Sequence, residues 1–230
     1  MTALEPYRAA RRGAAFIDLS ERGRLVLTGA DRASYLQGLL TNDVAALPPG
    51  EGCYSAYLTP QGRMIADMAV VNLGDELLLD VDAGVTAMLL ERLREFVFTE
   101  DVTVEDRTAA WTALAVHGPE AARIVAGLIR PVEDGAPLGA DALGRLPEYH
   151  QRRGRFGDAP VAVVRSDEIG EVGFVLYADA AAARPLAGAL AGAGAAELDA
   201  ETFALLRLEA GRPAFPADMD ESTIPLEAGI

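Results

Sequence analysis

The chain has 230 residues and a formal net charge of −15, because 35 Asp and Glu outnumber 20 basic residues, all of them Arg. This acidity argues against a nucleic-acid partner, since the phosphate backbone is also negative. The absence of lysine excludes a Walker A phosphate loop and a Schiff-base lysine. Two histidines and one cysteine exclude a three-histidine zinc site, an internal disulfide and a Cys-x-x-Cys motif, so we expect no metal site.

The N-terminal part of the chain gives the first predicted elements and no targeting signal. It has no apolar core of signal-peptide length, and no apolar run approaches 18 residues. We therefore expect a cytoplasmic protein without a membrane partner. Residues 24–28 predict a strand, and the turn at 29–31 leads into a helix with an apolar stripe. Residues 48–50, Pro-Pro-Gly, mark a candidate domain boundary.

Residues 54–71 predict two strands joined by a turn that contains Pro60 and Gly62. Asp67 places a carboxylate inside the otherwise apolar second strand. A buried charge is costly unless it is paired, lies at an edge or serves a function. Pairing with an arginine such as Arg63 would make Asp67 structural, whereas ligand binding or proton transfer would make it functional.

The rest of the chain alternates short strands and helices. The patterns predict strands at 76–81, 102–106, 111–116, 159–164 and 173–177, helices at 85–96, 119–128, 180–196 and 200–210, and a surface excursion at 130–147. This order favours an α+β fold with mainly antiparallel sheets. We assign 1–46 with 109–215 to a first, discontinuous domain, 47–108 to a second domain inserted in it, and 216–230 to a connection.

Glu171 is the second candidate for chemistry. It stands between Gly170 and Gly173 in the turn before a predicted strand, where the backbone can approach a ligand closely. The alternative is an ordinary exposed turn acid. We assign structural roles to the remaining polar candidates: His117, His150, Cys53, Arg207 with Glu209, and the acidic loop 218–221.

Four stretches resemble the T-protein (aminomethyltransferase) superfamily, in order and over nearly the whole chain. They are residues 29–44, 54–71, 170–173 and 206–227. Within the superfamily the chain looks most like the YgfZ branch, folate-binding proteins linked to iron–sulfur cluster assembly or repair. The resemblance implies two intertwined ferredoxin-like, antiparallel-sheet domains of the aminomethyltransferase folate-binding fold.

The resemblance also implies a pocket for tetrahydrofolate or a one-carbon derivative of it. Asp67 matches the carboxylate beside the reactive folate nitrogens and is the one candidate catalytic residue. Tyr54 matches an aromatic residue on the pterin side, and Glu171 matches the glutamate that reads the pterin. Asp82 falls where the transferases carry a ligand-contacting asparagine.

Three departures from the transferase pattern favour the YgfZ branch. Arg63 follows Gly62 where the transferases have Gly-Gly, Phe203 stands where they have an arginine, and Val172 stands where they have an acid. The signature of the branch, Lys-Gly-Cys-Tyr-x-Gly-Gln-Glu, is expected beyond Ile230, so the chain looks like a C-terminally truncated member without the terminal β-barrel. Cys53 does not match the signature cysteine.

Three functions are therefore open. The first is a tetrahydrofolate-binding accessory protein, not an efficient enzyme, whose partners are folate and iron–sulfur proteins or their assembly machinery. The second is a folate-dependent aminomethyltransferase or demethylase of the T-protein kind. The third is a non-catalytic interaction domain.

Overall fold

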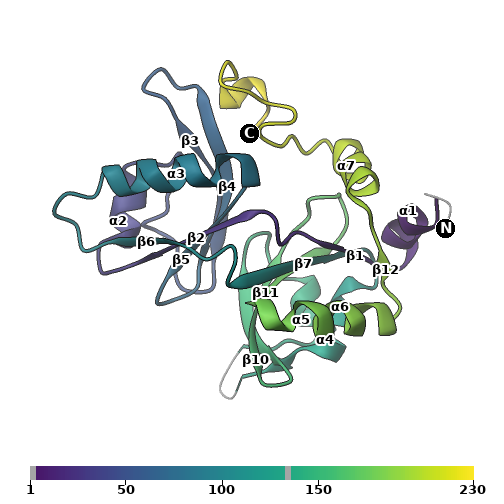
Figure 1. Ribbon diagram of the computed structural model, residues 1–230. Coiled ribbons are helices and arrows are strands. Elements are labelled where there is room, and N and C mark those ends of the chain that lie inside the picture. Colours follow the sequence, from purple (N-terminus) through teal and green to yellow (C-terminus); the bar gives the residue numbers. More distant parts are fainter. Residues whose placement is uncertain (1–3, 133–135) are drawn as a thin grey trace. The chain divides into compact units, whose positions relative to one another are not determined.

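The computed structural model describes residues 4–132 and 136–230, which form two compact units. Unit 1 consists of the chain up to Ser20 together with Ala109–Arg212, and unit 2 consists of Glu21–Thr108 together with Pro213–Ile230. Each unit has its own sheet (Figure 1). Each also has its own hydrophobic core. Both units are therefore discontinuous in sequence.

Unit 1 is built on a seven-stranded sheet in the order β12-β1-β7-β11-β10-β9-β8, antiparallel except for the parallel pair β1 and β12. Helices α4, α5 and α6 contribute Ile124, Leu143 and Leu190 to a core on one face of this sheet. The strands are β1 (Ala15–Asp18), β7 (Trp111–His117), β8 (Arg130–Pro131), β9 (Gln151–Phe156), β10 (Ala159–Arg165), β11 (Gly173–Asp179) and β12 (Ala196–Glu197). The helices are α1 (Leu4–Arg12), α4 (Ala121–Leu128), α5 (Ala140–Gly144), α6 (Ala183–Gly192) and α7 (Ala200–Glu209), with a 3₁₀ turn, η1, at Ala180–Ala182.

Unit 2 is built on a five-stranded antiparallel sheet in the order β3-β4-β5-β2-β6. Its elements are β2 (Gly23–Thr28), α2 (Arg32–Gln37), β3 (Gly52–Leu58), β4 (Met64–Asn72), β5 (Leu77–Val81), α3 (Ala83–Glu95), β6 (Thr103–Asp106) and the 3₁₀ turn η2 (Pro225–Glu227). Leu36 of α2 and Leu89 of α3 pack in one core with Met64, Ala66 and Met68 of β4. Because side chains alternate along a strand, Asp67 is on the opposite face of β4 from this row.

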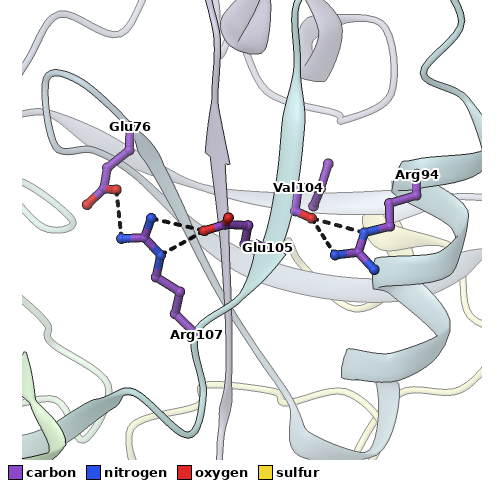
Figure 2. A network of polar contacts seen from close by, with 5 residues as sticks. All are labelled: Glu76, Arg94, Val104, Glu105 and Arg107. Carbon is purple, nitrogen blue, oxygen red and sulfur yellow. Dashed lines mark hydrogen bonds and ion pairs between the residues drawn. The ribbon is translucent and has the colours of Figure 1, made fainter.

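Arginine side chains hold β6, one of the two edge strands of the unit 2 sheet (Figure 2). Arg107 donates to Glu105 Oε2 from Nε at 3.2 Å and from Nη2 at 3.0 Å, and to Glu76 Oε2 from Nη1 at 3.2 Å. Arg94 of α3 donates from Nε and Nη2 to the carbonyl of Val104, at 3.0 and 2.7 Å. Exposed ion pairs contribute little to stability. The bonds from Arg94 occupy the Val104 carbonyl, a backbone acceptor on this edge strand that could otherwise pair with another chain.

The predicted fold class is confirmed: the chain is α+β, and both sheets are open and mainly antiparallel. The strands predicted at 24–28, 76–81, 102–106 and 111–116, and both strands of the 54–71 hairpin, agree with the structure within a few residues. Within the described ranges, no helix combines the length and the apolar character that crossing a membrane requires.

The expected domain division needs correction at residues 21–46 and 216–230. Strand β2 is hydrogen-bonded between β5 and β6, so 21–46 belongs to unit 2 and not with 109–212. Residues 216–230 pack in unit 2 through Met219, which is 3% exposed, and do not form a free connection. These pairings join residues far apart in sequence, which periodicity does not report.

Local assignments in unit 1 also need correction. The surface excursion at 130–147 contains β8 and α5 and buries Leu138, Leu143 and Leu146, although residues 133–135 lie outside the described part. Strand β9 was not predicted, because its alternation of arginines and glycine gives no apolar pattern. The helix predicted at 180–196 ends at Gly192, two residues before Gly194 adopts a positive φ of 97°.

Candidate functional site

The hairpin of β3 and β4 brings Tyr54 and Asp67 together. Ala56 is opposite Asp67 and Tyr54 is opposite Ala69, so Tyr54 is a diagonal neighbour of Asp67 on the same face of the sheet. An aromatic side chain spans that diagonal, and Tyr54 Oη donates to Asp67 Oδ2 at 3.1 Å. Strand pairing thus fixes the carboxylate and the phenol as one local group.

A second donor to Asp67 comes from the C-terminal segment Pro213–Ile230. The backbone N–H of Phe215 donates to Asp67 Oδ2 at 3.3 Å. The same segment is tied to the hairpin by Met64 N–H, which donates to the Thr223 carbonyl at 3.0 Å, and by Arg63, which donates to the Ser222 carbonyl. Phe215 is 6% exposed in the core of unit 2. The alternative that Arg63 neutralises Asp67 is therefore not what the structure shows.

The two oxygens of Asp67 have different environments. Both hydrogen bonds end on Oδ2, and no hydrogen bond from another described residue ends on Oδ1. Oδ1 is thus an acceptor to which no other described residue donates. Burial raises the pKa of Asp67, while the hydrogen bonds from Phe215 and Tyr54 and the charge of Arg22 offset part of that rise.

Asp82 lies at the junction of β5 and α3 in the same unit. The β4–β5 register ends at the pair Met68 and Val81, so Asp67 and Asp82 are the next residues along the two strands. Asp82 is the N-cap of α3: its Oδ1 accepts from the Gly84 N–H at 2.7 Å. This cap gives Asp82 a structural role that stands beside the predicted ligand contact.

Glu171 belongs to unit 1, in the turn between β10 and β11. Gly170 holds a φ of 75° there and donates its N–H to the Asp167 carbonyl at 2.8 Å. The Val172 carbonyl accepts from the Gly118 N–H, also at 2.8 Å. Gly173 cannot be replaced without movement, because a Cβ there would lie 1.9 Å from His117 Nδ1. The turn is therefore firmly anchored.

Arg11 of α1 pairs with Glu171. Its Nη1 lies 3.1 Å from Glu171 Oε1 and 3.0 Å from the Ile169 carbonyl, and its Nη2 lies 2.9 Å from Glu209 Oε2. No hydrogen bond from a described residue ends on Glu171 Oε2. Glu171 thus resembles Asp67: one carboxylate oxygen is held by the protein and the other is an available acceptor. Glu209 pairs with Arg11 and Tyr7, not with Arg207 as a neighbour on the helix.

The structure brings Tyr54 and Asp67 into contact, and it places Asp82 at the N-cap of α3, one residue beyond the pairing of β4 with β5. In the other unit it pairs Glu171 with Arg11. The sequence did not reveal Phe215 or Arg11. The first acts through its backbone N–H, which carries no sequence signal. Arg11 is 160 residues from Glu171, and the only sequence signal for it is its charge in a short amphipathic helix.

Comparison of the coordinates defines the class of fold first. The crystal structure of glycine cleavage system aminomethyltransferase T from Bartonella henselae matches with a TM-score of 0.82 at 24% identity, covering 97% of this chain and 58% of that one. A heterotetrameric sarcosine oxidase from Corynebacterium sp. U-96 matches with a TM-score of 0.56 at 21% identity, over 86% of this chain. The chain has the fold of the aminomethyltransferase T-protein.

Sequence comparison then gives the family. The GCVT N-terminal domain matches residues 2–230, so the chain belongs to this family, within the T-protein superfamily. An aminomethyltransferase from Rubrobacter xylanophilus is 33% identical over 97% of this chain and 58% of its own length. Another from Cutibacterium acnes is 32% identical over 99% of this chain and 62% of its own length. The chain thus spans about three fifths of these relatives.

Proposed function

We propose that the chain binds tetrahydrofolate as the folate-binding region of an aminomethyl-transferring protein, with Tyr54, Asp67 and Glu171 as contacts. The observation that carries the proposal is the Asp67 carboxylate. It is buried on a strand at 9% exposure, held through Oδ2 and open through Oδ1. Membership of the GCVT N-terminal domain family and the curated aminomethyltransferase relatives support this function over an iron–sulfur accessory role.

The described residues fit the chemistry of a reduced folate. The pterin ring presents ring N–H and amino donors, and a carboxylate oxygen without an internal partner is a matching acceptor. Asp67 Oδ1 and Glu171 Oε2 are both oxygens of this kind. Bound tetrahydrofolate supplies the amines that carry a one-carbon unit.

The role of Asp67 follows from its surroundings. Tyr54 and Phe215 keep Oδ2 in place, so Oδ1 is presented in a fixed direction. Because burial raises the pKa of Asp67, this carboxyl titrates closer to neutral pH than an exposed aspartate does. A carboxyl tuned in this way suits proton exchange with a bound amine.

Titration of the protein with tetrahydrofolate tests the contacts. Asp67→Ala and Glu171→Ala are each expected to raise the Kd about tenfold or more, the usual loss for a hydrogen bond to a charged group. Glu91→Ala, an exposed acid on α3, is the matched control and should leave the Kd unchanged. An unchanged Kd in both site variants would remove the site assignment.

Asp67→Asn separates function from stability. Asparagine keeps an acceptor for Tyr54 and Phe215 but removes the buried charge, whose burial raises the pKa of Asp67. We expect this variant to melt at a higher temperature than the wild type without folate, and to bind tetrahydrofolate less tightly. A lower Tm together with full affinity would contradict the role of Asp67.

Catalysis and binding can be distinguished by two measurements. Formation of methylene-tetrahydrofolate from an aminomethyl donor by the purified protein would identify a transferase. Ligand at about 100 times the Kd should stabilise a binder by about 2.7 kcal/mol. If tetrahydrofolate causes no thermal shift, the third possibility, a non-catalytic interaction domain, replaces the proposal.

The accessory function in iron–sulfur cluster assembly is the second candidate, and Phe203 favours it. This residue occupies the position where the resemblance expects an arginine, and its ring packs beside His117 with 5.9 Å between centroids. That position therefore offers no positive charge to a substrate. The test is the activity of iron–sulfur enzymes in cells that lack the gene: recovery with the wild-type gene and not with Asp67→Ala would support this role.

A further inference from the structure

Arg11 joins three segments of unit 1 through one guanidinium group. It stands in the last turn of α1, beside Arg12. Nη1 reaches the turn before β11 at the Ile169 carbonyl and at Glu171, and Nη2 reaches Glu209 at the end of α7. Tyr7, one helical turn earlier, lies under the guanidinium carbon at 5.9 Å and donates to the same Glu209 oxygen at 2.8 Å.

These contacts differ from an ordinary surface ion pair. A single exposed pair orders two long side chains and contributes little. Arg11 is three-quarters covered, and one of its bonds goes to a backbone carbonyl, so it fixes the path of the turn as well as the Glu171 side chain. The planar guanidinium directs its donors at set angles, which an ammonium group does not. Arg11 therefore restricts the direction in which Glu171 points.

The charges in this cluster do not balance. One arginine faces two carboxylates, Glu171 and Glu209, so the group keeps a net negative charge. Glu209 already accepts from both Arg11 and Tyr7, whereas Glu171 Oε2 has no donor among the described residues. The oxygen that can still accept a hydrogen bond from a ligand is therefore Glu171 Oε2. It suits a heterocycle that presents N–H donors and disfavours an anion.

We infer that Arg11 is a positioning residue for ligand recognition: it holds Glu171 through Oε1 so that Oε2 is presented to the N–H donors of the pterin. The inference rests on the proposed folate binding and extends it to a residue that need not touch the ligand. The orientation of this one carboxylate oxygen then depends on three segments: α1, the turn at 169–171 and the end of α7.

The test is a double-mutant cycle with tetrahydrofolate on the full chain. Arg11→Ala should raise the Kd about tenfold, as Glu171→Ala does, and the double variant should bind no worse than either single variant. Non-additivity of this kind is the result that a merely structural arginine would not produce. Arg12→Ala removes the same charge from an exposed neighbouring position and should leave the Kd unchanged.

The outcomes separate the two proposals. If Glu171→Ala binds tetrahydrofolate normally, the assignment of Glu171 fails. If Glu171→Ala binds weakly and folded Arg11→Ala binds normally, only the positioning role fails. Should Arg11→Ala not fold, Arg11→Lys replaces it: it keeps the charge but cannot serve the Ile169 carbonyl, Glu171 and Glu209 in one plane. An unchanged Kd in Arg11→Lys would overturn the inference.

Discussion

Acidification is expected to destabilise unit 1 through His117, the last residue of β7. This side chain is fully buried, and among the described residues neither ring nitrogen has a hydrogen-bond partner. Gly173 runs directly against the ring, and Phe203 packs on its other side. Burial, and then the positive charge of Arg165, lower the pKa of His117 to about 4.

The magnitude follows from the difference between folded and unfolded pKa values. An unfolded histidine titrates near pH 6.5, so between about 6.5 and about 4 the unfolded chain binds a proton that the folded chain does not. The folded state therefore loses stability as the pH falls through this window. Between pH 7 and pH 5 the loss from His117 is about 2 kcal/mol, and it approaches about 3 kcal/mol below pH 4.

Urea unfolding at pH 7, 6 and 5 measures this loss, and His117→Phe removes its source. The raised pKa of Asp67 acts in the opposite direction, since it favours the folded state at low pH, so the difference between wild type and variant is the informative quantity. His150→Phe, at the only other histidine in the sequence, is the control substitution. If His117→Phe keeps the wild-type pH dependence, or if the folded imidazole titrates near pH 6.5 by NMR, the reasoning is refuted.

Three further predictions concern particular residues. Gly173→Ala should lower the unfolding free energy by several kcal/mol, because its Cβ would overlap the His117 ring. Gly188→Ala, in the open middle of α6, should instead raise it by about 0.5–1 kcal/mol, and thermal melts compare the two variants. Cys53 is half-buried against the core of unit 2, and burial and then the charge of Asp43 raise its pKa to about 11. Iodoacetamide at pH 8 should therefore label Cys53 in the folded protein at least about tenfold more slowly than in urea, as followed by mass spectrometry. Asp82→Ala should lower the stability of unit 2 by about 1 kcal/mol through loss of the α3 cap, while Asp82→Asn should not; equal melting of the two would show that the cap is unimportant.

The sequence identified Asp67 because its charge interrupts an apolar strand, and strand register then explains why Tyr54 reaches it. The second donor to Asp67 could not be predicted, since Phe215 is 148 residues away and donates through its backbone. Arg63 was the obvious candidate by proximity in sequence. The structure directs it to the Ser222 carbonyl, because the C-terminal segment lies against the hairpin.

The same distinction between local and distant contacts explains the domain assignment. The periodicity of residues 24–28 correctly gives a strand, but nothing in it indicates the pairing of Val26 with Leu78 and Glu105. Short and polar elements were missed for a different reason. Strand β9 has buried positions only at Gln151 and Gly154, so its place in the sheet comes from neighbours and not from its own apolar residues.

The position of β1 in the sheet of unit 1 has a consequence for synthesis. Ala15 of β1 pairs with His117 on one side and Ala196 on the other, so β1 is an interior strand whose two partners are synthesised about 100 and about 180 residues later. The sheet of unit 2 has all its strands once Asp106 has emerged. A translating ribosome thus releases a complete five-stranded sheet while both edges of β1 are still bare, and the sheet of unit 1 is completed only when Ala196–Glu197 of β12 has emerged.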